Sequence, residues 1–415
     1  MEFRTFKSAP AIAAKPLGVI LNNQQLRRDK MYEDIEFSSD FSVEDWNALV
    51  TLKLKKYFTN ENIFESNKEI LRTEIINFIR FSKKPEYFSL FEWIFNLHKE
   101  CLSKDKVHAI KIISDSFNEV SDTDMKWMTN VLTQSDISTF SERDKISYLF
   151  KCIDETIEGV FKPRFKLFDK IAYFSLNQSE IDNSNFDFGK IIRDFPIQYK
   201  NEVLLLLQDP VFSISTNQWR NIASHKSFVI NKEDIDIEYG KISIQRLTIS
   251  YEQFYKIFYW SQDIYRVLRL AQVLIDLNHI EEIVTELGGT ENLDVRFESS
   301  LLHIIQNMQI VGFEFASTED DTNTFCLNVK GKHNHDVKSS LIHASQCLDQ
   351  LSCAIYDDKF VRDNFQNTQI SIVNENHEKL GSAKIPIEIA LKKVKSEIDL
   401  AEYLDNMKFE IKNYA

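Results

Sequence analysis

Glycine and proline, the residues that most often interrupt regular elements, are scarce in this chain. Its 415 residues include nine Gly and seven Pro. So few interruptions over such a length favour long helices.

Cysteine is also sparse. The five cysteines are scattered along the chain without a CxxC pair. An odd number, with no secretory signal, argues against a disulfide framework and for reduced thiols. Cys347 and Cys353 lie six residues apart in an expected helix and are expected to be buried core thiols.

Long apolar runs are missing as well. The longest aliphatic run, residues 203–207, is far too short to span a bilayer. Residues 1–5 lack the apolar core of a signal peptide. We therefore expect a cytoplasmic protein without a membrane segment.

Positive charge is in deficit, since the formal net charge is −13 at pH 7. This balance argues against a protein that coats nucleic acid with its whole surface, but it leaves room for an enzyme with a local basic site. Residues 141–280 are nearly neutral, with 18 Lys and Arg against 19 Asp and Glu. This section is therefore the one best suited to bind phosphate.

The chain does contain enough apolar sequence for sizeable cores, at 43% hydrophobic residues. Its length suits two or three domains. We predict a mainly α fold with a helical N-terminal domain of unassigned role over residues 1–140 and a helical bundle with a small hairpin over residues 141–287. Residues 290–415 are expected to form an α+β domain, a candidate sensor or regulatory domain. The only Gly pair, Gly288-Gly289, marks the expected linker.

Local patterns place the helices. Apolar spacing predicts N-terminal helices over residues 60–81, 88–97 and 109–117. Ser141 is expected to cap a helix that ends near Val160, with a second helix after Pro163. Ser250 is expected to cap a long helix that reaches about Ile283.

Alternating patterns place the strands. Period-two alternation around Gly240 predicts a small hairpin over residues 235–244. Further on, strand pairs are expected at residues 309–315 with 324–329, and at 369–373 with 383–387. A helix is expected between these pairs, over residues 336–356.

One segment of the middle section is suited to be a reaction centre. Within six residues it places a permanent cation, a carboxamide and an imidazole, at Arg220, Asn221 and His225. Arg grips phosphate well, and His moves protons near neutral pH. A phosphodiester cleaved without a metal needs both. Ser215 and Thr216 are candidate N-caps for a helix on which Asn221 and His225 share a face.

The segment Arg220-Asn221-Ile222-Ala223-Ser224-His225 resembles the R-x4-6-H motif of the HEPN superfamily, whose members form a four- to five-helix bundle. The expected helix order from about residue 141 to 285 is also similar. The resemblance covers about a third of the chain. It implies a metal-independent endoribonuclease and a homodimer in which two motifs form one composite site. It also implies a role as a toxin or antiviral defence protein.

Within this resemblance, the catalytic residues are Arg220, Asn221 and His225, with no metal or other cofactor. The implied reaction is attack of the ribose 2′-hydroxyl on the adjacent phosphate, which leaves a 2′,3′-cyclic phosphate and a 5′-hydroxyl. His225 would act as general base or acid, Arg220 would hold the phosphate, and Asn221 would orient His225 or bind a phosphate oxygen. The implied partners are RNA and an antitoxin or other defence-system protein.

A basic stripe accompanies the motif. Lys162, Lys166 and Lys170 fall at i, i+4 and i+8, with Arg164 nearby, and Lys226 follows His225. These five residues are candidate RNA-binding residues. The alternative is a solvated helix face.

Other hypotheses remain open. An ion pair of Arg220 with, for example, Glu233 or Asp234, and a capping or core role for His225, would leave a catalytically silent HEPN-like binding or scaffold module that regulates a partner enzyme. A ligand- or protein-binding C-terminal domain would make the chain a regulatory protein. A second Arg–His match, Arg296 and His303, lies in an apolar run and is expected to be structural.

Two further candidates are assigned structural roles. His333, His335 and Asp336 with Cys326 fit no standard zinc spacing, so we expect a polar turn and no metal site. Trp219 is expected to pack in the core or at the dimer interface rather than to stack on a base.

Overall fold

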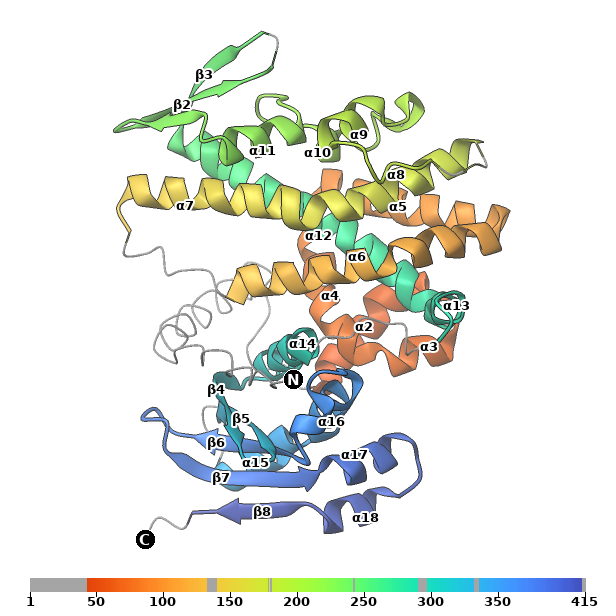
Figure 1. Cartoon of the computed structure of the whole chain (residues 1–415), viewed down its shortest axis with the longest axis vertical. Coiled ribbons are helices and arrows are strands. Elements are labelled where there is room, and N and C mark those ends of the chain that lie inside the picture. The colour runs from red at the N-terminus through yellow and green to blue at the C-terminus, as the bar shows by residue number, and fades with distance from the viewer. Residues whose placement is uncertain are drawn as a thin grey trace, which may run out of the picture. The chain divides into compact units, whose positions relative to one another are not determined.

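The computed structural model describes residues 43–132, 140–177, 179, 181–241, 243–289, 297–331 and 336–412. It is mainly helical and divides into two compact units (Figure 1). One unit comprises residues 40–131 and 137–302, and the other takes in residues 303–415. Helices on both sides of residue 140 thus belong to one unit, so the boundary expected there does not separate two compact units.

The first unit consists of helices and one small sheet. In chain order its helices are α2 (Val43–Leu54), α3 (Glu61–Ser66), α4 (Lys68–Ser82), α5 (Pro85–Lys104), α6 (Lys106–Leu132), α7 (Glu142–Asp154), α8 (Lys162–Asn177), α9 (Phe188–Asp194), α10 (Leu204–Leu207), α11 (Thr216–Ser224), α12 (Tyr251–Asn278) and α13 (Ile280–Glu286). The sheet contains β1 (Phe228–Ile230), β2 (Asp234–Tyr239) and β3 (Gln245–Ser250).

Helix α12 is the core of this unit. Its buried residues lie all around the helix because α4, α5, α7 and α8 pack against it. Ser250 begins it with a reciprocal capping box, in which Gln253 is the partner. The expected cap is therefore confirmed, although the helix ends at Asn278 and the chain continues as α13.

Helices α7 and α8 are joined without a break. Ser141 caps α7 by accepting from the Asp144 N–H, as expected. A π-helical stretch, Glu155–Phe161, then leads directly into α8. Pro163 lies where the bonding changes from π to α, so its missing N–H interrupts little of the hydrogen-bond ladder.

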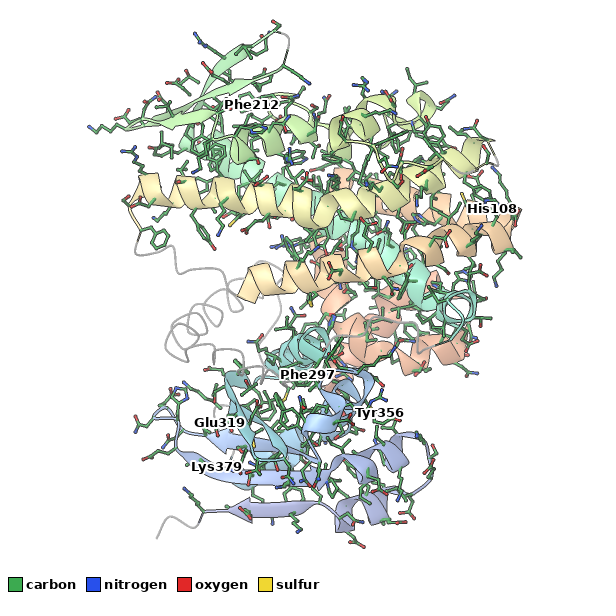
Figure 2. All side chains as sticks on the ribbon, in the orientation of Figure 1. His108, Phe212, Phe297, Glu319, Tyr356 and Lys379 are labelled. Carbon is green, nitrogen blue, oxygen red and sulfur yellow. The ribbon has the colours of Figure 1, made fainter. Side chains whose placement is uncertain are left out.

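Aromatic and apolar side chains fill the space between the helices of the first unit (Figure 2). His108 of α6, for example, stacks on Phe174 of α8 with ring centroids 4.8 Å apart. Within the described residues, no helix is both long and apolar enough to cross a membrane.

The three-stranded sheet confirms a hairpin around Gly240, although its second strand begins at Gln245, beyond the expected residues 235–244. β2 pairs antiparallel with β3, and β1 adds a third strand that was not expected. Gly240 adopts a φ of 96°, and a Cβ there would meet the Ser243 carbonyl oxygen at 2.4 Å. The turn therefore requires glycine.

The second unit is α+β, as expected for the C-terminal section. Its five strands lie in the order β4-β5-β6-β7-β8, with β5 and β6 parallel. The strands are β4 (Glu314–Asp321), β5 (Thr324–Lys330), β6 (Asn367–Val373), β7 (Lys379–Pro386) and β8 (Lys408–Ile411). The helices are α15 (Val337–Ser345), α16 (Leu348–Asp357), α17 (Ile387–Val394) and α18 (Leu400–Asp405).

Both expected strand pairs of this unit are present, but the first strand, β4, begins at Glu314, five residues later than expected. Residues 309 and 310 end helix α14 (Phe297–Ile310) instead of beginning a strand. The boundary between the units also falls inside α14, and not at Gly288-Gly289. Cys347 is buried as expected, whereas Cys353 is half-buried.

Candidate active site

Helix α11 carries the Arg-Asn-x-x-x-His segment, and its buried side chains anchor it to the residues that precede it in the chain. Trp219 is fully buried and donates from Nε1 to Asp209 Oδ2 at 2.8 Å, which confirms its packing role. Thr216 donates to the Leu206 carbonyl at 2.7 Å. Ser215 occupies the N-cap position, although its side chain bonds Asn217 and not a helix N–H.

The C-terminal end of α11 is a tight Schellman turn. The Ser227 N–H donates to the Ile222 carbonyl, and the Lys226 N–H donates to the Ala223 carbonyl. Lys226 takes the left-handed position of this turn with a φ of 54°, where glycine is usual. His225 is therefore the last residue before the chain turns away, and its side chain is exposed.

Arg220 is half-buried between two carboxylates of the facing helix. Its Nε lies 3.1 Å from Glu158 Oε2 and 3.8 Å from Asp154 Oδ1. The Nε–H is not aligned with Glu158 and has no hydrogen-bond acceptor among the described residues. Nη1 donates to Asn221 Oδ1 at 3.1 Å. Arg220 and Asn221 thus contact each other directly.

Of the two carboxylates, Asp154 has a pKa that its surroundings change. Burial raises the pKa of Asp154 above its ordinary value, and Glu158 adds to the increase. Arg220 and His225 both oppose it. Arg220 and Asn221 therefore form one cluster with Asp154 and Glu158, and His225 follows about one helical turn after Asn221.

The sequence did not predict the carboxylates of this cluster. Glu233 and Asp234 were the partners considered for Arg220. The actual partners lie at the junction of α7 and the π-helical stretch. The i, i+4 spacing of Asp154 and Glu158 was a signal that these carboxylates share a helix face. π-Helical turns inside α-helices are frequent at functional sites.

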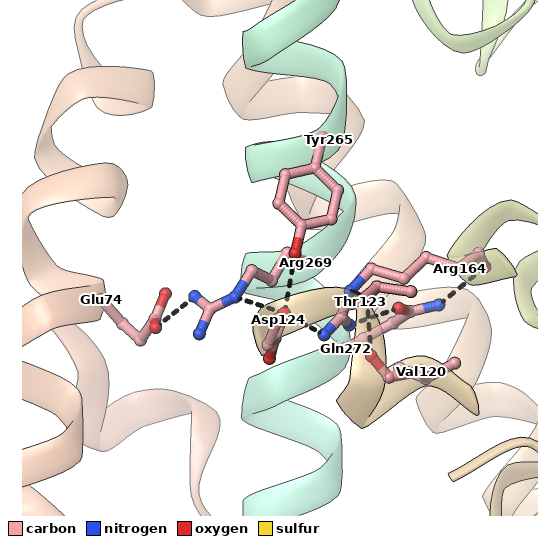
Figure 3. Close-up of polar contacts among 8 residues, drawn as sticks. All are labelled: Glu74, Val120, Thr123, Asp124, Arg164, Tyr265, Arg269 and Gln272. Atoms are coloured by element: carbon pink, nitrogen blue, oxygen red, sulfur yellow. Dashed lines mark hydrogen bonds and ion pairs between the residues drawn. The ribbon is translucent and has the colours of Figure 1, made fainter. Parts of the chain in front are cut away.

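Arg164 is not an RNA-binding residue, and this expectation was wrong. Its side chain is 1% exposed and pairs with Asp124 of α6. It also donates to Thr123 and to Gln272 of α12 (Figure 3). Arg164 falls on the inner face of α8, because its neighbours Phe165 and Phe168 are also fully buried.

The lysines of the expected stripe contact the protein rather than forming a free row. Lys162 pairs with Glu158 at 2.5 Å, next to Arg220. Lys166 donates to the Ser184 carbonyl at 2.8 Å, and Lys170 lies 3.5 Å from Ser116 Oγ. Only Lys226 of the five candidates is fully exposed.

Among the described residues, no cluster of three His, Cys, Asp or Glu side chains is arranged to hold a metal ion. Asp336 caps α15, and Cys326 is buried in β5. His333 and His335 lie outside the described residues, as does Arg296. His303 lies on α14.

Comparison with known proteins adds no relative to this description. The chain matches no protein-family model, no curated protein and no solved structure.

Proposed function

We propose that the chain is a metal-independent endoribonuclease that cleaves RNA through its 2′-hydroxyl, in antiviral defence or as a toxin. The observation that carries the proposal is the end of α11. There Arg220 and Asn221 are in direct contact, His225 is exposed, and the Arg220 Nε–H has no aligned acceptor among the described residues. The side chain is 30% exposed but Nε itself is buried, so a phosphate oxygen can reach this donor only when Arg220 moves away from Glu158.

The chemistry follows from these positions. Arg220 would bind the scissile phosphate and stabilise its growing charge. His225, exposed at the C-terminal end of α11, would act as general acid. A general base is then needed on the other side of the phosphate. We propose that His225 of a second copy supplies it in a homodimer with a composite site.

The carboxylates set a condition on this reaction. Asp154 and Glu158 neutralise Arg220 in the free protein. An RNA phosphate must therefore compete with Glu158 for the guanidinium. The free state is accordingly a resting state, and binding of RNA or of a partner protein would shift Arg220 toward phosphate.

RNA cleavage by the purified chain and by the Arg220→Ala and His225→Ala variants, with and without EDTA, tests the proposal. EDTA-resistant cleavage that leaves 2′,3′-cyclic phosphate ends and is lost in both variants would support it. A DNA oligonucleotide of the same sequence is the substrate control, since it lacks the 2′-hydroxyl. Cleavage that persists in both variants would rule out this site.

The ion pair itself favours a second candidate function. An Arg220 held by Glu158 and Asp154 is also what a catalytically silent module would show, with the pair stabilising the contact between α11 and α7. Such a module would regulate a partner enzyme. Equal inertness of the wild type and both variants on RNA, with or without extract from infected cells, would favour this function.

A further inference from the structure

Three cations of the first unit converge on one buried carboxylate. Asp263 of α12 lies 2.7 Å from Lys84 Nζ, 3.2 Å from Arg266 Nη1 and 3.9 Å from Arg80 Nη1. Asp263 is 6% exposed, whereas the three cations are partly open to solvent. The cations come from the end of α4, the start of α5 and the middle of α12. We call these four residues the Asp263 cluster.

The Asp263 cluster has a surplus of positive charge. Three cations and one carboxylate leave a net charge of +2, in a protein whose formal net charge is −13. Among the described residues, no second carboxylate forms an ion pair with Arg80, Lys84 or Arg266. Burial lowers the pKa of Arg266 to about 10, and the neighbouring Arg80 adds to this decrease, whereas Asp263 opposes it.

The start of α5 adds positive potential to the cluster. Lys84 occupies the N-cap position of this 20-residue helix, and its side chain turns to Asp263 instead of capping. N-caps are normally Ser, Thr, Asp or Asn, because the helix N-terminus is the positive end of the dipole. Asp263 therefore offsets both the charge of Lys84 and part of the helix dipole.

Aromatic rings lie beside the cations. The Arg266 guanidinium lies 5.1 Å from the centre of the Trp127 ring, and Lys84 Nζ lies 5.2 Å from the centre of the Tyr87 ring. These contacts hold the two cations in place without neutralising them. Preorganised cations that share a single carboxylate are suited to bind a further, doubly charged oxyanion, and guanidinium groups match phosphate geometry.

We propose that the Asp263 cluster binds the phosphate group of a small phosphorylated molecule. The surplus of two positive charges equals the charge of a phosphate dianion. Free phosphate and a nucleotide share this chemistry. The site is independent of the proposed RNA cleavage, since none of its four residues belongs to the candidate active site on α11.

Calorimetric titration of the full-length chain with inorganic phosphate, AMP and ATP, in chloride buffer, tests this proposal. We expect at least one of the three to bind, and Arg80→Gln or Lys84→Gln to weaken binding by about tenfold each. The matched control is Lys256→Gln, on the same helix as Arg266, which removes an exposed cation paired with Glu252 at 2.8 Å. It should leave binding unchanged. Equal affinity for phosphate and AMP would identify free phosphate as the ligand, and tighter binding of AMP or ATP would identify a nucleotide.

Thermal unfolding separates a ligand site from a structural one. Without phosphate, Arg80→Gln and Lys84→Gln should unfold close to the wild-type temperature, because each loses both an attraction to Asp263 and a repulsion from the other two cations. With phosphate, only the wild type and Lys256→Gln should gain stability, since ligand binding to the native state stabilises it. The proposal is overturned if the wild type binds none of the three compounds. It is also overturned if both variants bind like the wild type, or lose stability without phosphate.

Discussion

At the scale of single residues, Glu158 controls how available Arg220 is to phosphate. Glu158→Gln removes a negative charge 3.1 Å from the guanidinium. We expect RNA affinity to rise by about threefold to tenfold, because the phosphate no longer competes with a carboxylate. The measurement is fluorescence anisotropy with labelled RNA, in a His225→Ala background that leaves the RNA uncut.

The matched control for that variant is Glu155→Gln. Glu155 lies in the same π-helical stretch but pairs with Lys151 at 3.5 Å. Glu155→Gln removes the same charge without directly altering the ion pair of Arg220, so its effect on RNA affinity should be much smaller. Equal increases in RNA affinity in both variants would show that affinity depends only on the net charge of the helix.

Arg164 is a structural residue, so its replacement should unfold the protein rather than weaken RNA binding alone. Arg164 and Arg269 together hold the pKa of Asp124 well below its usual range, against the effect of burial. Arg164→Gln removes half of this compensation, and we expect a loss of about 3–5 kcal/mol in the free energy of unfolding. Urea denaturation followed by circular dichroism measures it.

Lys166 is the matched control, two residues further along the same helix and partly exposed. Lys166→Gln should change the free energy of unfolding by less than about 0.5 kcal/mol. An Arg164→Gln variant with wild-type stability and reduced RNA affinity would instead restore the RNA-binding role that the sequence suggested.

Asp276 of α12 should make stability fall as the pH rises. Burial raises its pKa from 3.8 to about 7, the nearby Asp124 adds to this, and Arg164 opposes it. Its Oδ1 has no hydrogen-bond partner among the described residues. The folded protein thus holds a proton that the unfolded chain releases, and the stability this provides is complete below about pH 4 and lost by about pH 7.

Asp276→Asn keeps the shape and removes the titration. We expect it to stabilise the protein by about 1–3 kcal/mol at pH 8 and to have little effect at pH 4. Urea melts at the two pH values measure the difference. A uniform effect across this range would mean that the carboxyl does not titrate there.

At the scale of elements, the C-terminal turn of α11 carries strain next to the site. Lys226 holds a left-handed φ of 54° that glycine adopts freely. Lys226→Gly should therefore stabilise the turn by about 0.5–1 kcal/mol, measured as an increase in the urea midpoint. Lys226→Ala keeps the unfavourable φ and is the control. If the alanine variant gains as much as the glycine variant, then charge and not backbone strain is the cause.

At the scale of the whole molecule, the two units should separate as folding units. Every helix that positions Arg220, Glu158 and Trp219 belongs to the first unit. We expect a fragment of residues 40–289 to retain a cooperative thermal transition and its helical circular dichroism. Scattered, non-cooperative melting of this fragment would show that residues 290–415 are needed for the fold.

The same fragment tests the role of the C-terminal unit. Under the proposed nuclease function, RNA cleavage by a folded fragment that no longer depends on a trigger would support a sensor role for residues 290–415. Unchanged dependence on a trigger would place the sensor elsewhere.

Elements whose signals are local could be predicted from the sequence. The Ser141 and Ser250 caps and the strands around Gly240 depend on residues a few positions apart, so chain neighbours determine them. The helix that carries Arg220 and ends next to His225 was also predicted in this way.

Only the tertiary structure decided which charges meet. Arg164 pairs with Asp124, 40 residues away, and Lys84 pairs with Asp263, 179 residues away. Arg164 was predicted to belong to a basic stripe because the spacing of the neighbouring lysines does not indicate which face of α8 is buried. That choice depends on how α6, α8 and α12 pack together, since burial and long-range ion pairing are properties of the packed helices and not of any one segment.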